Sequence, residues 1–301
     1  MTTAPQIPAR RYAIGSASFE APSLAPGLYI VATPIGNLGD ITIRALSTLA
    51  AAGSVLCEDT RTTAKLFERY ALRTPLYPYH EHNAAKVRPG ILARLKDGAA
   101  IALVSDAGMP LVSDPGYRLV REAVAEGVMV TACPGASAVL TGLALSGLAT
   151  DRFAFLGFLP QKSGERKKLF TEVGSFRSTL IFFESPHRIV DALKDLAEAM
   201  PKREVAMTRE LTKLHEEVLR GSAAEIATIL EARPAIKGEI TLLVGPPGAG
   251  AEAFTEDDLS RAVADALVSM PASKAAAEVS RRFGVPKKDI YARILALKSD
   301  D

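Results

Sequence analysis

The chain has 301 residues, of which 48% are hydrophobic and 23% are charged, and this composition excludes a mainly disordered or fibrous protein. No apolar run approaches the roughly 18 residues that a membrane-spanning helix needs, so an integral membrane protein is excluded too. The 36 Lys and Arg residues almost balance the 34 Asp and Glu residues and leave a net charge of +2, so any surface that binds nucleic acid must be local.

The N-terminal residues and the cysteines indicate in which cellular compartment the protein is expected. Residues 1–26 contain several prolines and no apolar period, which predicts a disordered extension. No apolar segment follows Arg10 and Arg11, so we expect no secretory signal and a cytoplasmic protein. Cys57 and Cys133 are too few for a disulfide framework or a cysteine-based zinc site. Both follow apolar runs typical of strands, so we expect them to be small buried residues.

Strands and helices alternate along the first half of the chain. In chain order, the pattern predicts a strand at 28–32, a helix at 42–52, strands at 54–57 and 99–104, a turn plus helix at 114–126, a strand at 128–132 and a helix at 136–148. Because such alternation is the signature of parallel β–α–β units, it predicts an α/β domain over residues 27–140.

A second α/β domain is expected over residues 141–246. Its predicted elements are strands at 152–159, 178–183, 204–207 and 239–244, helices at 189–199 and 223–232, and a basic loop at 161–168, with more antiparallel pairing than in the first domain. A Gly- and Pro-rich segment predicts a linker at 247–254. Residues 255–301 are helical in pattern, and two helices at 273–283 and 286–297 around Gly284 predict a helix-turn-helix-like module.

Four loops that follow predicted strands of the first domain are rich in Gly, Pro and Asp. They are residues 33–40, 58–61, 105–116 and 134–138, and the third contains Ser-Asp-x-Gly twice. Ligands of open α/β sheets bind at the carboxyl ends of the strands, and glycines allow the backbone to approach a ligand closely. The four loops therefore predict a cofactor cleft.

The loops leave the identity of the cofactor open. Glu58 ends the second strand about 20 residues past the first loop, as the acidic residue of a nicotinamide-binding fold does. However, no Gly-x-Gly-x-x-Gly follows the first strand, and no Gly-x-x-x-x-Gly-Lys-Ser/Thr occurs anywhere in the chain. A dehydrogenase therefore stays a weakly supported alternative.

A set of motifs in both predicted domains resembles one known family. The motifs are Leu-Tyr-Ile-Val-Ala-Thr-Pro-Ile-Gly-Asn-Leu-Gly-Asp-Ile-Thr (28–42), Glu-Asp-Thr-Arg (58–61), His-Glu-His-Asn (80–83), Ser-Asp-Ala-Gly-Met-Pro-Leu (105–111), Pro-Gly-Ala-Ser-Ala (134–138), Asp-Arg-Phe (151–153), Gly-Phe-Leu-Pro (157–160), Phe-Phe-Glu-Ser-Pro-His-Arg (182–188), Arg-Glu-Leu-Thr-Lys (209–213) and Lys-Gly-Glu (237–239). Over about residues 27–300, the chain resembles the bacterial ribosomal RNA small-subunit methyltransferases of type I, which belong to the tetrapyrrole-methylase-like superfamily.

This resemblance implies a fold, a cofactor and a reaction. The fold would be a two-domain tetrapyrrole-methylase-like α/β fold with the cofactor cleft between the domains, plus the small C-terminal helical module. The cofactor would be S-adenosylmethionine, and the reaction would methylate the ribose 2′-oxygen of cytidine 1402 in 16S rRNA, near the decoding centre. Carried over by motif, the cofactor-binding residues would be Pro34, Ile35, Asp106, Gly108, Met109, Pro110, Val112, Ala136, Ser137, Phe183 and Glu239. Related families often have an acid where this chain has Met109, so Asp106 is expected to take that role.

The chemistry narrows the catalytic candidates. Methyl transfer from a sulfonium to a hydroxyl is an in-line displacement, in which positioning, a general base or a cation beside the developing alkoxide can help. Six residues on the predicted cleft-side loops could serve in this way: Glu58, Asp59, Arg61, His80, His82 and His187. Of these, we choose Asp59, Arg61 and His82 as the catalytic candidates. Asp59 would act as base or orienting group and Arg61 as partner of an RNA phosphate or of the alkoxide, although a purely structural ion pair between the two is equally compatible. No metal site is predicted, because two histidines without a further ligand are weak evidence.

Two basic segments are candidates for RNA binding. Residues 161–168 carry four cations against one acid, and residues 272–298 carry seven against two. The predicted RNA-binding residues are Lys162, Arg166, Lys167, Lys168, Arg188, Lys287 and Lys288, with His187 and Lys213 as further candidates. A solvated surface or a packing module would show the same charge pattern.

Two other functions are weighed against rRNA methylation. A methylase of a corrin or porphyrin precursor would share the fold but would need neither basic segment. A non-enzymatic nucleic-acid-binding regulator would use the C-terminal module but would not need the four loops. The resemblance also implies a homodimer that acts on 16S rRNA, either free or in the assembled small subunit.

Overall fold

The computed structural model describes residues 10–112, 116–247, 256–283 and 285–299. The chain divides into two compact units, residues 1–246 and residues 247–301, and each is described by itself. Among the described residues, none of the helices combines the length and the apolar character that are needed to cross a bilayer.

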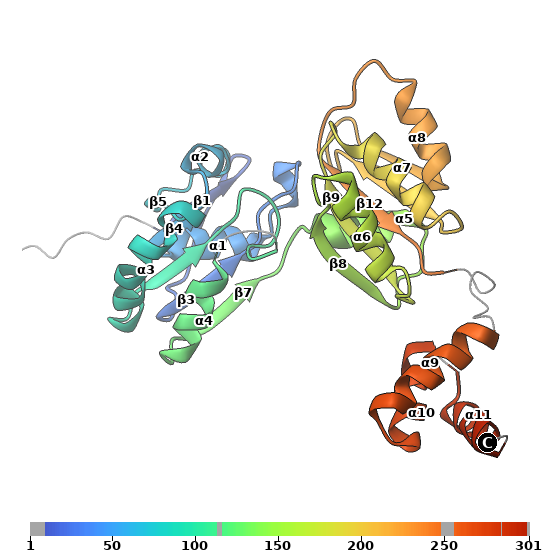
Figure 1. The fold of residues 1–301 in the computed structure, drawn as a ribbon. Helices are drawn as coiled ribbons and strands as arrows, with labels where there is room; N and C mark the ends of the chain where they lie inside the picture. Colours follow the sequence, from blue (N-terminus) through green and yellow to red (C-terminus); the bar gives the residue numbers. More distant parts are fainter. Residues whose placement is uncertain (1–9, 113–115, 248–255, 284, 300–301) are drawn as a thin grey trace, which may run out of the picture. The chain divides into compact units, whose positions relative to one another are not determined.

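The first half of the larger unit is built on a parallel five-stranded sheet (Figure 1). Its strands are β3 (Gly27–Val31), β4 (Ser54–Cys57), β5 (Leu76–Pro78), β6 (Ala100–Leu103) and β7 (Val130–Cys133), in the order β5-β4-β6-β3-β7. Every residue of β3 and β4 is buried, as expected for strands covered by helices on both faces. Cys57 and Cys133 are buried free thiols, which confirms the prediction that they are small buried residues.

Helices cover both faces of this sheet. They are α1 (Ile43–Ala51), α2 (Thr60–Arg69), α3 (Glu81–Lys96) and α4 (Tyr117–Ala125), and a short 3-10 helix η1 (Leu38–Asp40) precedes α1. Side chains of α1 and α2, such as Leu49 and Phe67, pack on one face, whereas side chains of α3 and α4, such as Leu95 and Leu119, pack on the other. The sheet is therefore doubly wound, and all of its strands point their carboxyl ends toward the same edge.

The N-terminal segment departs from its prediction. The strands β1 (Arg11–Ile14) and β2 (Ala17–Glu20) form an antiparallel hairpin around Gly15. Tyr12 stacks on Phe19 and is buried in the same core as α1, and Ala13 N donates to Tyr70 O at 2.8 Å. The prediction of a disordered extension over residues 1–26 is therefore wrong for residues 10–26, because the proline content hid a short hairpin with an apolar anchor. Residues 1–9 lie outside the described residues.

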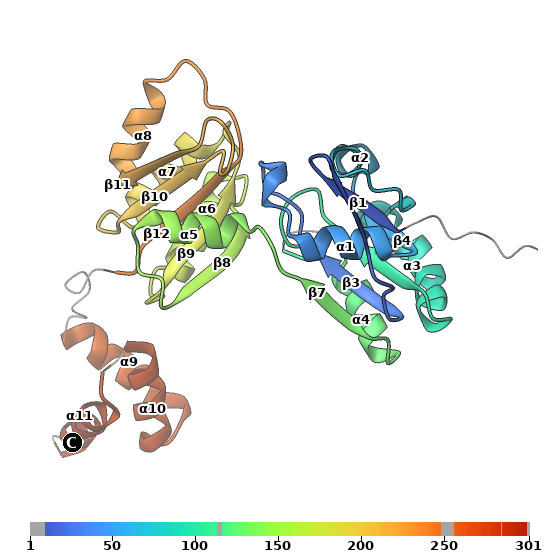
Figure 2. The ribbon, with the colours of Figure 1, turned by 180° about the vertical axis from the view of Figure 1, so that it is seen from behind.

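The second half is built on a mixed five-stranded sheet (Figure 2). Its strands are β8 (Phe153–Phe158), β9 (Thr179–Glu184), β10 (Val205–Arg209), β11 (Glu217–Gly221) and β12 (Ile240–Val244), in the order β11-β10-β12-β9-β8. Only β8 and β9 pair in parallel, and the other neighbours are antiparallel, which confirms the predicted antiparallel character.

The helices of this half are α5 (Ala138–Ser146), α6 (Ser163–Val173), α7 (Ile189–Ala199) and α8 (Ala223–Glu231). Buried residues of α6, α7 and α8 cover one face of the sheet, and Val139 and Leu143 of α5 pack against Leu243 on the other face. The domain boundary predicted between residues 140 and 141 thus falls inside α5, whose core contacts lie with the second sheet. The predicted loop at 161–168 is wrong from Ser163 onward, because α6 begins there.

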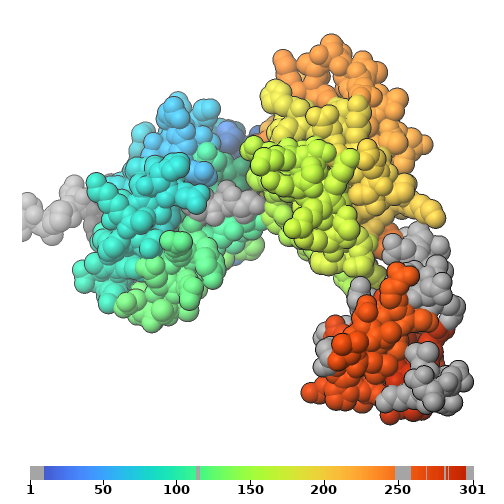
Figure 3. All heavy atoms as spheres, viewed as in Figure 1, coloured from blue at the N-terminus to red at the C-terminus, as the bar shows by residue number. Residues whose placement is uncertain are grey.

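The smaller unit consists of three helices that share one core. Figure 3 draws its described atoms in orange to red. They are α9 (Glu256–Ser269), α10 (Ala272–Phe283) and α11 (Lys287–Ser299). Val263, Val279 and Ile294 are among the core residues, each of them at most 2% exposed. The two helices predicted for the helix-turn-helix-like module coincide with α10 and α11 within two residues at each end. Gly284 lies outside the described residues, and so does most of the linker predicted at 247–254.

Candidate cofactor pocket

A cavity of about 390 Å³ lies at the carboxyl edge of the first sheet, against the ends of three strands of the second. From the first half, the loops after β3, β6 and β7 contribute Ile35, Asp106, Ala107, Gly108, Met109, Val112 and Ser137. The start of α5 contributes Ala138 and Val139. From the second half, the ends of β8 and β9 and the start of β12 contribute Phe158, Phe183, Glu184, Ser185, Pro186, Gly238, Glu239, Ile240 and Thr241. The cavity is therefore located where the Gly- and Asp-rich loops predicted a cleft.

Backbone hydrogen bonds join the first and third loops on the wall of this pocket. Thr33 N donates to Gly108 O at 2.9 Å, and Gly108 N donates to Thr33 O at 3.0 Å. Gly108 has a φ of +78°, which disfavours any side chain, and an added Cβ would lie 3.4 Å from Cγ2 of Ile35. The backbone conformation therefore favours a glycine here, while an added Cβ would only reach van der Waals contact with Ile35.

Apolar side chains supply much of the pocket surface. The rings of Phe158 and Phe183 meet edge to face with their centroids 5.5 Å apart. Ile35, Met109 and Val112 line the pocket from the first half. The combination provides an apolar surface against which a planar ring such as a nucleobase can pack.

Asp106 and Glu239 place carboxylates on opposite walls of the pocket. Burial raises the pKa of Asp106 above its usual range, although a hydrogen bond from the backbone of Asp59 works against that shift. Glu239 is largely exposed and accepts from Lys213 Nζ at 3.0 Å. The pocket thus offers hydrogen-bond acceptors and negative charge, which favour a ligand that carries hydroxyls or a positive charge.

Asp59 and Arg61 form an ion pair beside the pocket rather than on its lining. Asp59 caps α2 by accepting from Arg61 N at 2.8 Å, and its carboxylate also accepts from Arg61 Nη2 at 2.7 Å. These bonds to Arg61 lower the pKa of Asp59 to about 2. Such a carboxylate is a poor proton acceptor, so this geometry favours the orienting role predicted for Asp59 over the role of base.

Glu58 has the opposite electrostatic environment. Its pKa is raised by burial and then by Asp106, while His80 works in the other direction. His80 begins α3 and His82 follows in the first turn of that helix, with ring centroids 6.0 Å apart. The exposed His82 lies outside the pocket lining, and so do Asp59, Arg61 and Glu58.

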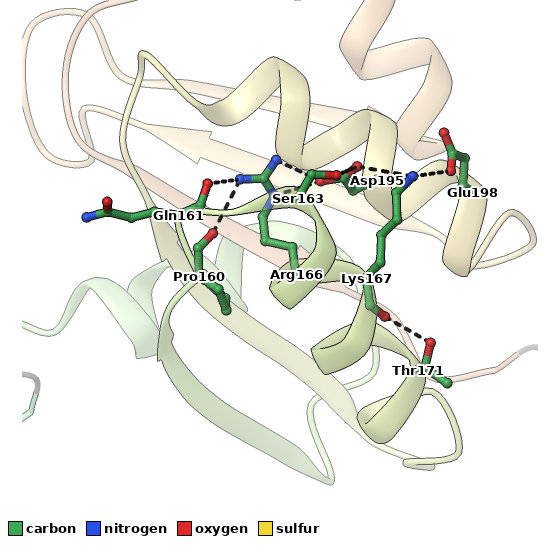
Figure 4. Close-up of polar contacts among 8 residues, drawn as sticks. All are labelled: Pro160, Gln161, Ser163, Arg166, Lys167, Thr171, Asp195 and Glu198. Atoms are coloured by element: carbon green, nitrogen blue, oxygen red, sulfur yellow. Dashed lines mark hydrogen bonds and ion pairs between the residues drawn. The ribbon is translucent and has the colours of Figure 1, made fainter.

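The predicted RNA-binding residues of α6 have unequal surroundings (Figure 4). Arg166 is 4% exposed, pairs with Asp195 at 2.7 Å and donates to Gln161 O at 2.8 Å. The prediction that Arg166 binds RNA is therefore wrong, because its guanidinium is buried and already paired with Asp195, which also accepts a hydrogen bond from Ser163. The sequence of the basic segment does not show that Arg166 pairs with Asp195, an acid 29 residues further along the chain.

The other predicted RNA-binding residues are more accessible. Lys162 pairs with Glu165 at 3.3 Å and Lys167 with Glu198 at 2.5 Å, in ion pairs at the protein surface. Lys168 is exposed on the same helix, and Lys287 and Lys288 are exposed at the start of α11. Arg188 pairs with Glu184, whose side chain is fully buried, at 2.6 Å. Arg188 is therefore less available to RNA than the lysines.

The pocket includes most of the predicted cofactor-binding residues and several that the prediction missed. Ile35, Asp106, Gly108, Met109, Val112, Ser137, Phe183 and Glu239 line it, whereas Pro34, Pro110 and Ala136 are their chain neighbours. The missed residues come mainly from the second half, where Phe158, Ser185, Pro186 and Gly238 line the pocket. All four stand inside motifs of the family resemblance, which was the available signal for them.

Comparisons with known proteins agree with this architecture. A family model described as Tetrapyrrole (Corrin/Porphyrin) Methylases matches residues 27–227, and one described as RsmI C-terminal HTH domain matches residues 253–298. A solved diphthine synthase has the same fold, with a TM-score of 0.55 at 15% identity over 72% of this chain and 89% of that one.

Two curated relatives are much more similar in sequence. Ribosomal RNA small subunit methyltransferase I of Mesorhizobium japonicum is 48% identical over 95% of this chain and 97% of its own length. The protein of the same name from Erythrobacter litoralis is 48% identical over 93% of this chain and 98% of its own length. The match therefore extends through both halves of the larger unit and the helical module. On this similarity, together with the fold and the pocket, the chain belongs to the ribosomal RNA small subunit methyltransferase I family, within the tetrapyrrole methylases.

Proposed function

We propose that this chain transfers a methyl group from S-adenosylmethionine to the ribose 2′-oxygen of a cytidine in 16S rRNA, cytidine 1402 near the decoding centre. The observation that carries the proposal is the pocket between the two sheets of the larger unit, in a chain that is 48% identical to a ribosomal RNA small subunit methyltransferase I over nearly its whole length.

The residues of the pocket fit S-adenosylmethionine. Phe158, Phe183 and Met109 offer apolar surface for the adenine, and the carboxylates of Asp106 and Glu239 offer acceptors for ribose hydroxyls or for the cationic groups. Gly108 allows the left-handed backbone conformation of the loop at this wall of the pocket. When bound, this cofactor supplies an electrophilic methyl group activated by the positive sulfur.

The groups beside the pocket act on the acceptor ribose. Arg61 is 89% exposed and carries a positive charge next to the pocket, so it can contact an RNA phosphate or the oxygen that gains negative charge. Asp59 orients Arg61 through their ion pair. Glu58, whose pKa is raised, is better suited than Asp59 to accept the proton of the attacking hydroxyl.

The basic surface residues hold the RNA. Phosphates attract the charges of Lys162 at the N-cap of α6, of Lys167 and Lys168 on that helix, and of Lys287 and Lys288 on α11. The substrate is 16S rRNA, free or within the small ribosomal subunit, and the enzyme acts in the cytoplasm as a homodimer. A low-molecular-weight substrate would need neither of these cationic surfaces.

The experiment that tests the substrate class compares three possible acceptors. Purified chain and labelled S-adenosylmethionine are incubated with small ribosomal subunits that lack the modification, with naked 16S rRNA, and with a porphyrin precursor. Incorporation into either RNA sample supports the proposal. Incorporation into the porphyrin precursor alone would replace it with methylation of a small tetrapyrrole.

A further inference from the structure

The loop that joins β10 to β11 has an unusual backbone. In this segment, residues 210–216, which we call the clasp loop, Glu210 has a φ of +53° and Thr212 a φ of +64°. A positive φ costs free energy for residues other than glycine, and most of all for a β-branched residue such as Thr212. Such strain persists only where surrounding contacts impose it, and it often marks a functional segment.

One side of the clasp loop holds the first loop of the pocket. Asn37 N donates to Thr212 Oγ1 at 3.1 Å, although the two residues are 175 positions apart in the chain. The backbone of Gly36 lies so close that an added Cβ would be 2.5 Å from Cγ of Lys213 and 2.9 Å from Leu211 O. This contact requires a glycine immediately after Ile35, which lines the pocket.

The other side of the clasp loop holds the opposite wall. Lys213 Nζ donates to Glu210 Oε1 at 2.7 Å and to Glu239 Oε2 at 3.0 Å. Glu239 N donates to Glu210 Oε1 at 3.1 Å, and Glu210 N donates to Glu239 O at 3.0 Å. The side chain of Glu210 also fills the space that a Cβ on Gly238 would occupy. Gly238 and Glu239 both line the pocket.

The clasp loop therefore contacts a pocket-lining segment from each sheet. Hydrogen bonds with Lys213 lower the pKa of Glu210, and its bonds to both carboxylates outweigh burial in raising the pKa of Lys213. Both shifts favour the charged forms of Glu210 and Lys213, so at neutral pH Lys213 forms a bridge between the side chains of Glu210 and Glu239.

We propose that Thr212 and Lys213 are positioning residues of the pocket, which set its affinity for S-adenosylmethionine by holding the Gly36–Asn37 turn and Glu239 on one strained loop. The inference rests on the proposed function, because it takes the ligand of the pocket from there. Neither residue lines the pocket itself, so both act through Ile35 and Glu239.

The first test measures cofactor binding by titration calorimetry on the full chain. Thr212→Val removes the acceptor of the Asn37 N–H while keeping the shape of the side chain, and it should raise the Kd about three- to tenfold. Thr212→Ser keeps the hydroxyl and should restore most of the affinity. Thr228→Val is the matched control, because Thr228 donates only to Ala224 O on the exposed face of α8.

The second test removes the bridge. Lys213→Met leaves Glu210 and Glu239 as unpaired neighbours and should raise the Kd about tenfold. Lys194→Met, which breaks a surface ion pair between α7 and Glu231, should leave the Kd unchanged. In the methylation assay, Lys213→Met should raise KM for the cofactor while kcat at saturation stays close to wild type.

These experiments distinguish failure of the clasp-loop proposal from failure of the proposed function. If the wild type does not bind S-adenosylmethionine, the proposed function fails and the clasp proposal with it. If the wild type binds, but Thr212→Val and Lys213→Met bind equally well, the clasp proposal alone is overturned. It is also overturned if the variants lower only the midpoint of thermal unfolding and leave the Kd unchanged.

Discussion

The backbone N–H of Asp59 donates to Oδ1 of Asp106 at 3.2 Å, which joins the start of α2 to the wall of the pocket. Asp106 lines the pocket, whereas Asp59 faces Arg61. Two acids that stand at the ends of neighbouring strands, β4 and β6, therefore have different environments. Desolvation raises the pKa of Asp106, whereas the ion pair with Arg61 lowers the pKa of Asp59 to about 2.

Asp106→Asn should weaken the binding of S-adenosylmethionine about tenfold, because it removes a negative charge from the wall of the pocket while keeping the shape of the side chain. Titration calorimetry measures this directly. Asp97→Asn is a suitable control, since Asp97 lies at the far end of α3. Unchanged affinity in Asp106→Asn would mean that the carboxylate does not contact the cofactor.

Asp59→Ala should leave cofactor affinity near that of the wild type and lower turnover, because it frees Arg61 from its orienting partner. It also removes the N-cap of α2, so the free energy of unfolding should fall by about 1 kcal/mol. Calorimetry, steady-state methylation and chemical denaturation report the three quantities separately. An equal loss of cofactor binding would make Asp59 a scaffold residue for the pocket.

Arg166→Met should change stability, whereas Lys168→Ala should change RNA binding. Arg166→Met removes the nearest cation from the buried Asp195 and leaves it only Ser163 and Lys167, whose Nζ is 3.7 Å away, so it should lower the free energy of unfolding by about 3 kcal/mol. Lys168→Ala should leave stability unchanged and reduce the salt dependence of RNA binding by about one phosphate contact. The slope of log K against log salt, measured at several salt concentrations, decides whether Lys168 touches the RNA.

Glu217 should make the larger unit sensitive to acid. Arg233 and Arg209 hold its pKa at about 2, below the ordinary value of 4.5. Because the folded-state pKa is depressed, this stabilisation is present above about pH 4.5 and is lost as the pH falls toward 2. Glu217→Gln should therefore cost about 1–2 kcal/mol at pH 7, with solvent screening taken into account, and progressively less in acid. A difference from wild type that persists at pH 2 would contradict this.

Removal of residues 251–301 should separate RNA recognition from cofactor binding. The pocket is built entirely from the larger unit, so the truncated chain should bind S-adenosylmethionine like the wild type. Methylation of RNA should fall strongly, because Lys287 and Lys288 are lost with the module. Full activity on RNA after truncation would show that the module does not hold the substrate.

The sequence predicted those features that depend on local pattern. The apolar runs before Cys57 and Cys133 indicated strands of a parallel sheet, and three of the four loops singled out after its strands line the pocket. The residues on the second wall, such as Phe183 and Glu239, came only from family resemblance, because nothing local shows that β9 and β12 reach the pocket. A contact between residues far apart in the chain leaves no signal in the local sequence. The charge pattern around Arg166 therefore suggested RNA binding and did not show the ion pair with Asp195.

Local composition gave a wrong prediction where a few tertiary contacts determine whether a segment folds. The proline content of residues 1–26 suggested disorder, yet the burial of Tyr12 anchors a hairpin on the first core. The strained backbone of Thr212 has no signature in sequence either, because it depends on contacts with Asn37 and with Glu216, whose carboxylate accepts from Thr212 N at 2.7 Å.

The most direct test of the central claim maps the methyl group that the enzyme adds. Small ribosomal subunits from a strain without the modification are methylated with labelled S-adenosylmethionine, and the rRNA is cleaved with alkali. Because 2′-O-methylation removes the hydroxyl that attacks the neighbouring phosphate, we predict one alkali-resistant linkage, at cytidine 1402. A label on a base, on another nucleotide, or on no RNA at all while the cofactor is bound would contradict the account.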